Sequence, residues 1–120
     1  MRPEYKAIVR HIFPGSELDH IGMTARHLEA TGFEVHDVEA LREHYARTTE
    51  LWCRRLMARR KEAVAIAGEQ RTRLWIAYLA GVSLGFRRGT INIFQTVASA
   101  RSRGASGLPP TRNDLYRAAK

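Results

Sequence analysis

Hydrophobic positions recur at helical spacing between residues 17 and 31. The apolar residues of this segment lie three or four positions apart: Leu18, Ile21, Ala25 and Leu28. This spacing predicts an amphipathic helix over 17–31. Ser16 precedes the helix as a candidate N-cap, and Gly32 follows it as a candidate C-cap.

Segment 33–39 has the shorter period of a strand. Its apolar residues are Phe33, Val35 and Val38, with Glu34 and His36 between them on the opposite face. We predict a strand over 33–39, although the alternation breaks at Asp37-Val38.

Two long helices are predicted from the helical period that resumes at residue 41. The first, over 41–67, has one apolar stripe made of Leu41, Tyr45, Thr48, Trp52 and Leu56. The second, over 69–88, has a wider apolar face made of Leu74, Trp75, Tyr78, Val82 and Phe86. Gly68 separates the two helices, because glycine is unfavourable inside a helix.

Residues 91–98, INIFQTVA, are β-branched or apolar at most positions, which predicts a second strand covered on both faces. Two strands about fifty residues apart do not make a stable sheet by themselves. Either these strands pair in an unexpected way, or the rest of their sheet lies outside this chain. The whole pattern predicts a helix-rich α/β fold.

The net positive charge of the chain indicates which class of partner it would bind. The chain has 20 Lys or Arg residues and 12 acidic residues, for a net charge of +8. Such an excess favours an anionic partner. Residues 101–120 hold five of the cations and one acid, with two glycines and two prolines, and we expect them to form a flexible basic tail.

The other cations form short clusters along the predicted helices. These clusters are Arg54-Arg55, Arg59-Arg60-Lys61 and Arg87-Arg88. A solvated helix face is the simplest interpretation, and an anionic phospholipid surface is the next. Nucleic acid is the least favoured partner, because neither a reading helix nor aromatic residues on a basic sheet are visible.

Several classes of site and location are excluded or disfavoured. The single cysteine, Cys53, allows no disulfide framework and no cysteine-based zinc site, so we expect it to pack as a small apolar residue. The longest uncharged stretch, 74–86, would make a helix of about 20 Å, too short to cross a bilayer. No apolar signal-peptide core follows Met1, so we expect a cytoplasmic protein.

The polar residues form no recognisable catalytic or cofactor motif. All five histidines lie in the first 44 residues without the convergent spacing of a metal site, and we expect solvent-facing or helix-capping roles for them. The chain has no G-x-S-x-G nucleophile motif and no G-x-G loop for a nucleotide-like cofactor. The sequence therefore predicts no metal and no cofactor bound by this chain alone.

Four fragments in order carry a family resemblance. They are HIFPGSEL (11–18), ATGFEVHDVEALREHYARTTELW (30–52), EAVAIAGEQRTRLWIAYLAG (62–81) and GFRRGTINIFQTV (85–97). Together they resemble the C-terminal part of the cyclopropane-fatty-acyl-phospholipid synthase family, which includes the mycolic acid cyclopropane synthases. The resemblance implies that residues 1–100 form the C-terminal lobe of a class I S-adenosylmethionine-dependent methyltransferase with a Rossmann-like sheet. The two strands would close one end of that sheet, and the long helices would form a substrate-facing insertion.

The resemblance also implies roles for particular side chains. Tyr45 matches the tyrosine of the family's HYA motif, which helps to hold a bicarbonate that accepts a proton as the cyclopropane ring closes. Tyr78, Val82 and Phe86 match the wall of the acyl-chain tunnel, and Thr49 is placed with them as a substrate-binding residue. The three residues on 69–88 also share one helix face by spacing alone, and plain core packing remains an alternative for that face.

The departures from the family pattern limit what the chain is expected to do. Ser16 replaces a glycine and Asp19 replaces a proline of the family motif. The family's first two-thirds, with the cofactor loop and the other bicarbonate ligands, has no counterpart here. We therefore expect the chain to be inactive alone and to pair with a separate N-terminal methyltransferase half or with a second copy of itself. An interaction module using an exposed sheet edge, or a small protein that binds anions or the inner face of a membrane, remains an alternative.

Overall fold

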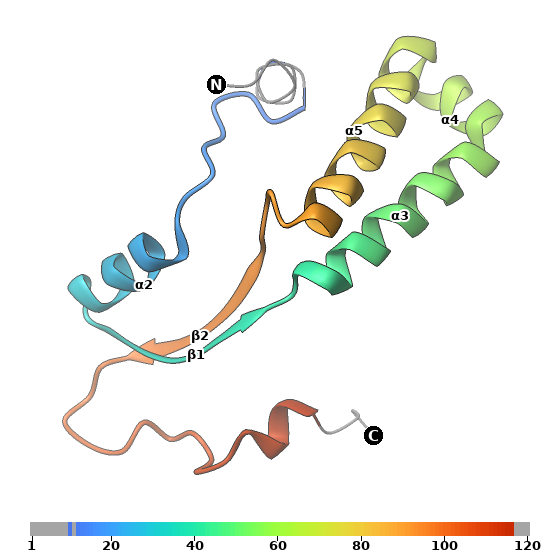
Figure 1. The fold of residues 1–120 in the computed structure, drawn as a ribbon. Helices are drawn as coiled ribbons and strands as arrows, with labels where there is room; N and C mark the ends of the chain where they lie inside the picture. Colours follow the sequence, from blue (N-terminus) through green and yellow to red (C-terminus); the bar gives the residue numbers. More distant parts are fainter. Residues whose placement is uncertain (1–9, 11, 117–120) are drawn as a thin grey trace.

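The computed structural model describes residues 10 and 12–116, which form a helical hairpin joined to a two-stranded sheet (Figure 1). In chain order the elements are α2 (Ile21–Ala30), β1 (Phe33–Ala40), α3 (Arg42–Ala58), α4 (Arg60–Ala67), α5 (Glu69–Arg88), β2 (Phe94–Ala100) and the 3-10 helix η1 (Arg112–Tyr116). The radius of gyration is 18.5 Å. A closed globule of this length would have a value of about 14 Å, so the chain is open and elongated.

The hairpin consists of α3 and α5 packed side by side, with α4 at the turn between them (Figure 1). The buried residues at their interface are Ala46, Thr49 and Cys53 from α3, and Thr72, Leu79, Ser83 and Phe86 from α5. Ser83 Oγ donates a hydrogen bond to the Ala46 carbonyl across the interface, at 2.9 Å. Small side chains on α3 permit this close approach.

The buried face of α3 differs from the predicted apolar stripe. Trp52, expected on that stripe, has 48% of its surface exposed, whereas Thr49 and Cys53 are buried. The predicted packing role of Cys53 is confirmed, because only 8% of it is exposed. α5 packs against the face of α3 that carries small residues. The hydrophobic pattern of the sequence does not show which face of α3 is buried.

The predicted single helix over 41–67 is wrong in one respect, because it breaks at Arg59. There the backbone leaves the helical region, with φ −109° and ψ 29°, and α4 starts at the next residue. The predicted break at Gly68 is confirmed, and its φ of +83° is one that glycine adopts readily. The helix predicted over 69–88 has the bounds Glu69–Arg88 in the structure.

The two strands pair with each other in an antiparallel ladder. Val35 lies opposite Ala98 and Asp37 lies opposite Val97, so His36 is the extra residue of a β-bulge. The bulge explains why the sequence alternation breaks at Asp37. The strand predicted over 33–39 is confirmed with one added residue, Ala40.

The second strand begins later than the predicted 91–98. It starts at Phe94, because the Asn92 side chain accepts a hydrogen bond from the Ile93 amide, and Ile91 packs against α5 beside Gly85. The expectation that this strand is covered on both faces is not met within residues 12–116, where none of its residues is buried.

The first helix begins at Ile21 and not at residue 17. His20 is the N-cap, because its Nδ1 accepts a hydrogen bond from the Gly22 amide at 3.2 Å. Ser16 instead closes a turn, with its amide donating to the Phe13 carbonyl. The expected capping role of a histidine is thereby confirmed for His20.

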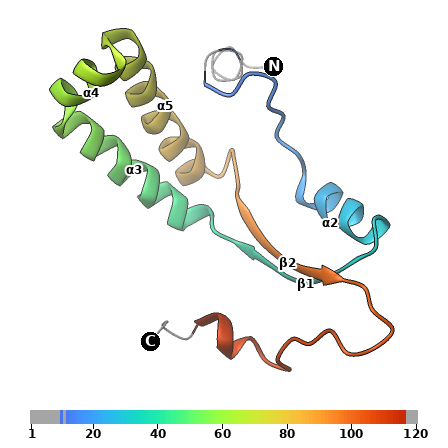
Figure 2. The ribbon, with the colours of Figure 1, turned by 180° about the vertical axis from the view of Figure 1, so that it is seen from behind.

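The segment after β2 returns along β1, as Figure 2 shows from behind. Arg112 Nε lies 2.7 Å from Asp37 Oδ2, and Arg112 Nη2 donates to Asp37 Oδ1 at 3.0 Å. Only 11% of the Asp37 side chain is exposed. The two bonds join η1 to the strand residue that follows the bulge.

Candidate functional site

Tyr45 and Phe86 meet at the end of the hairpin that adjoins the sheet. Their ring centroids are 5.8 Å apart and tilted by 59°. β1 passes directly into α3 through Leu41, whose amide donates to the Ile93 carbonyl at 3.0 Å. This link holds the start of α3, and therefore Tyr45, beside the end of α5.

Thr49 lies one helical turn further along α3, on its buried face. Only 4% of the residue is exposed, and its hydroxyl donates to the Tyr45 carbonyl at 2.6 Å. This hydroxyl is therefore satisfied within its own helix. Thr49 belongs to the same hairpin interface as Phe86.

Tyr78 belongs to a cluster of three aromatic rings on another part of α5. Its ring lies 5.6 Å from Phe13 and 5.5 Å from Trp75, both in edge-to-face geometry, and Phe13 also contacts Trp75 at 6.4 Å. Burial in this cluster raises the pKa of the Tyr78 hydroxyl above its ordinary value. Phe13 comes from the loop before α2, and helical periodicity gives no signal for it.

The predicted substrate residues thus fall into two connected groups. Phe86 is in the hairpin interface with Tyr45 and Thr49, and Tyr78 is in the aromatic cluster. Val82 is half-buried and lies one helical turn from each of the two α5 residues. The face that they share rises about 12 Å along α5.

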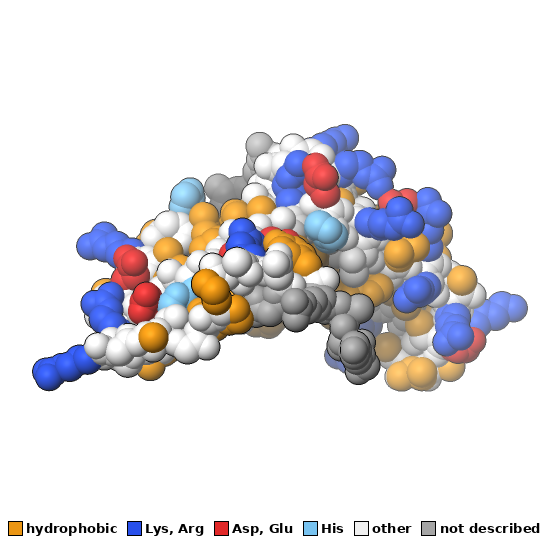
Figure 3. Space-filling model, turned by 90° about the horizontal axis from the view of Figure 1, so that it is seen from below, with side chains coloured by type: hydrophobic (Ala, Val, Ile, Leu, Met, Phe, Trp, Pro, Cys, Tyr) orange, Lys and Arg blue, Asp and Glu red, His pale blue; other side chains and the backbone are white. Residues whose placement is uncertain are grey.

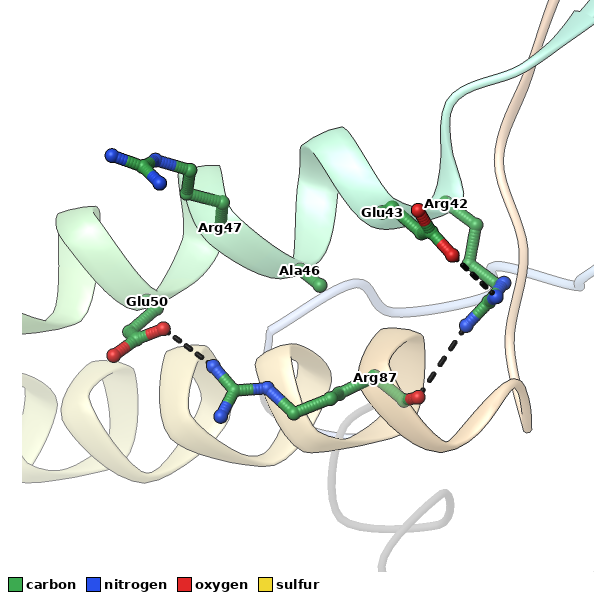
Figure 4. A pocket seen from close by; sticks show the side chains of 6 residues that line it. All are labelled: Arg42, Glu43, Ala46, Arg47, Glu50 and Arg87. Carbon is green, nitrogen blue, oxygen red and sulfur yellow. Dashed lines mark hydrogen bonds and ion pairs between the residues drawn. The ribbon is translucent and has the colours of Figure 1, made fainter.

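A polar groove runs beside the same end of the hairpin (Figure 4). It has a volume of about 380 Å³ and is lined by Arg42, Glu43, Ala46, Arg47, Glu50 and Arg87. Arg42 Nη1 donates to the Phe86 carbonyl at 2.8 Å, and Arg87 Nη2 pairs with Glu50 across the helices at 2.5 Å. These contacts hold α3 and α5 together. The polar side chains of the groove therefore serve mainly to stabilise the hairpin.

His36 contacts the opposite strand through the bulge. Its Nε2 lies 2.8 Å from Ser99 Oγ, and its Nδ1 lies 4.0 Å from Glu34 Oε1. The second distance is too long for a hydrogen bond. Ser99, His36 and Glu34 are the residue types of a hydrolytic triad. The Glu34 carboxylate is too far away to orient the His36 imidazole, so the hydrogen bond between His36 and Ser99 only joins the two strands.

Other site classes find no support in the part of the chain described. No group of three or more His, Cys, Asp or Glu residues there is arranged to hold a metal ion. None of the described helices combines the length and the apolar character needed to cross a membrane.

The amino-acid sequence of the chain is similar to those of known lipid-modifying enzymes. Residues 2–96 match the family model described as mycolic acid cyclopropane synthetase. The chain is 40% identical over 111 residues to a probable fatty acid methyltransferase of Pseudomonas putida, covering 92% of this chain and 28% of that protein. It is 39% identical over 90 residues to cyclopropane mycolic acid synthase 1 of Mycobacterium tuberculosis, covering 75% and 31%.

The fold of the chain is also similar to part of two solved cyclopropane synthase structures. The crystal structure of mycolic acid cyclopropane synthase CmaA1 complexed with SAH and CTAB superposes with a TM-score of 0.75 at 35% identity, covering 81% of this chain and 34% of that one. The cyclopropane synthase MmaA2 from Mycobacterium tuberculosis superposes with a TM-score of 0.74 at 36% identity, covering 79% and 34%. The chain therefore spans about a third of the length of these relatives.

Proposed function

The chain belongs to the mycolic acid cyclopropane synthetase family, and from this premise we propose that it forms the acyl-chain side of an S-adenosylmethionine-dependent lipid methyltransferase. The family resemblance and the methyltransferase fold predicted from the sequence are confirmed by the matches above. The proposed reaction is methyl transfer to the double bond of an unsaturated acyl chain.

The apolar face of α5 carries this proposal. Tyr78 and Val82 form a half-buried apolar face, which the Phe13 and Trp75 rings extend at one end and which meets the buried ring of Phe86 at the other. An acyl chain placed along such a face gains about 0.8 kcal/mol for each methylene removed from water. The face is thus suited to hold a long hydrocarbon in an extended form.

Tyr45 lies at the other end of this face, beside Phe86. Its hydroxyl makes no hydrogen bond to another residue of the described ranges, so it has a free donor for a small anion. We assign to it the bicarbonate contact that the family implies. This side chain fits only part of such a site, because one phenol does not satisfy three anion oxygens. A bicarbonate bound there would supply the base for the proton released at ring closure.

The described residues do not fit the cofactor S-adenosylmethionine. A class I cofactor cradle needs glycines where a strand passes into a helix. The junction between β1 and α3, Ala40–Leu41–Arg42, contains none. We propose that the cofactor is held by residues outside this part, in a longer polypeptide or in a separate chain.

The two tryptophans of the chain allow a direct test of acyl-chain binding. Trp52→Phe leaves Trp75 as the only tryptophan, beside Tyr78, and Trp75→Phe leaves Trp52 on α3 as a matched control. We expect dibrominated stearate to quench the fluorescence of the variant that retains Trp75 and to have little effect on the other. Unbrominated stearate controls for changes in conformation. Equal quenching of both variants would contradict the proposed acyl-binding face.

A methyl-transfer assay tests the placement of the cofactor separately. The chain is incubated with radiolabelled S-adenosylmethionine and vesicles of unsaturated phospholipid. We expect no incorporation of label by the chain alone. Turnover would show that it binds the cofactor by itself, and it would leave the acyl-binding result intact.

An interaction module is the second candidate function. Each strand has one hydrogen-bonded neighbour in the described sheet, which leaves a free edge on both strands. Free edges favour pairing with a further strand. Size-exclusion chromatography with light scattering tests for a homodimer, and a monomer at micromolar concentration would argue against self-association.

A further inference from the structure

The positive charge of the chain is concentrated in two places. Residues 54–73 hold seven Lys or Arg residues against two Glu, and the tail 101–120 holds five against one. The rest of the chain therefore has a net charge of −1. Residues 54–73 comprise the end of α3, all of α4 and the start of α5, so they form the turn of the hairpin. We call this segment the hairpin tip.

Most cations of the hairpin tip are not used to hold the fold together. Arg54 pairs with Glu50 at 2.6 Å, and Arg60 pairs with Glu69 between α4 and α5. Five exposed cations make no ion pair with any residue of the described ranges: Arg55, Arg59, Lys61, Arg71 and Arg73. Their charge is directed to solvent and is available to a partner.

Exposed aliphatic side chains lie among these cations. Ile66 on α4 is 87% exposed, more than any other large hydrophobic residue described, and Met57 at the end of α3 is 57% exposed. Figure 3 shows hydrophobic and Lys or Arg side chains interspersed at the end of the molecule where the hairpin lies. Neither aliphatic side chain is needed for the interface between α3 and α5.

We propose that the hairpin tip docks on an anionic phospholipid surface, with Ile66 entering the boundary between headgroups and acyl chains. Cations around an exposed aliphatic residue are the composition of elements that lie on membranes. The hairpin tip has no aromatic residue, whereas single-stranded nucleic acid is held by stacking on such residues. This inference goes beyond the proposed function, because docking needs neither a cofactor nor turnover.

The hairpin tip lies close to the apolar face of α5, so docking of the tip would place that face near the membrane. α5 begins at Glu69 in the tip, and Tyr78 follows nine residues later. This separation is about 14 Å along the helix axis. A tip resting on the bilayer would bring the apolar face of α5 close to the acyl chains of the membrane.

Co-sedimentation with vesicles tests the proposal. The chain is mixed with phosphatidylcholine vesicles, with or without phosphatidylglycerol at about one lipid in three. The charge variant is the double substitution Arg59→Glu and Lys61→Glu, and its matched control is Arg101→Glu with Arg103→Glu in the tail, which has the same net charge. The apolar variant is Ile66→Ser, and its control is Leu18→Ser, at a residue that is 71% exposed outside the hairpin tip.

We expect binding only to the anionic vesicles. Each cation near such a surface contributes about fivefold to binding, so the loss of two costs about 25-fold, and the two introduced glutamates add repulsion. We therefore expect the tip charge variant to bind at least about 25-fold more weakly. The tail variant should lose less than fivefold, and Ile66→Ser should lose more than Leu18→Ser. Circular dichroism verifies that all four variants remain folded.

Three outcomes would overturn the proposal. Equal loss in the tip and tail charge variants would show that net charge alone matters. Equal binding to neutral vesicles would exclude charge recognition. Binding of duplex DNA or polyglutamate through the tip at least as tightly as anionic vesicles, at 0.15 M salt, would identify a different class of partner.

Discussion

The helical hairpin and the two-stranded sheet bury their side chains to very different extents. Every residue described as buried lies on α3 or α5. In β1 and β2 no residue is buried, although both strands are rich in apolar and β-branched residues. The two regions have similar hydrophobic content, but among the described residues only the hairpin buries side chains fully.

The difference shows which part of the fold is complete. The hairpin joins elements close in sequence, and every buried residue described lies on α3 or α5. A two-stranded sheet is marginal by itself and needs a further layer or strand. We infer that the hairpin is the more stable unit of this chain; under the proposed function, the sheet is the side that would contact the cofactor-binding part.

The largest expected effect comes from removing one ring in each region. Phe86→Ala would leave a cavity in the hairpin core and remove the contact with Tyr45, at a cost of about 3–5 kcal/mol in the free energy of unfolding. Phe94→Ala removes the same side chain from half-buried β2, and we expect a cost of about 1 kcal/mol. Urea unfolding followed by circular dichroism at 222 nm measures both costs.

This pair of variants tests the comparison directly. Both remove the same number of atoms, so the difference reports the surroundings of the side chain. If Phe94→Ala cost as much as Phe86→Ala, the sheet would have to be as well packed as the hairpin. Such a result would contradict the inference that the sheet is incomplete.

A smaller effect is expected where Arg112 of the tail pairs with Asp37 of β1. Asp37→Asn would weaken the paired bonds to Arg112 by about 1 kcal/mol, because one partner is half-exposed to water. We expect trypsin to cleave the tail after Arg103 about fivefold faster. Glu39→Gln is the matched control, since it removes a carboxylate from the same strand without breaking an ion pair within the described ranges. An unchanged cleavage rate in Asp37→Asn would show that this pair does not hold the tail.

Much of this fold follows from local sequence signals. The break at Gly68, the helix from Glu69 to Arg88 and the strand after Gly32 each rest on glycines or on a clear period. The bulge at His36 also has a signal, because the alternation fails at the next residue. These features depend on backbone preference and on residues close in sequence.

The misplaced boundaries have two kinds of cause. The starts of α2 and β2 are set by local side-chain hydrogen bonds of His20 and Asn92, whereas the break at Arg59 has no local signal. The break at Arg59 lies among good helix formers, and after it Arg60 pairs with Glu69 on α5. The family motif indicated Tyr45 and Tyr78 for the site, but the Phe13 ring that completes the aromatic cluster lies in a loop without periodicity. Phe13 does lie in the family fragment 11–18, but its contacts with Trp75 and Tyr78 are visible only in the three-dimensional structure.

The smallest expected effect concerns Tyr78, a titratable probe of the hairpin's aromatic cluster. Burial disfavours the phenolate, so the pKa of Tyr78 is raised above 10.0 in the folded chain. The unfolded chain therefore loses this proton first as the pH rises. The stabilising contribution of Tyr78 is fully present below pH 10 and falls as the pH rises from there through the folded-state pKa.

Absorbance at 295 nm between pH 9 and 12 measures this titration. We expect Tyr78→Phe to remove the latest component of the phenolate signal and to flatten the decline of stability above pH 10. Tyr116→Phe removes a phenol from η1 beside the sheet. We expect this variant to keep both the latest component of the phenolate signal and the decline of stability above pH 10. If Tyr116→Phe removed the late component instead, the more protected tyrosine would lie in the tail. The hairpin would then not be the better closed of the two regions.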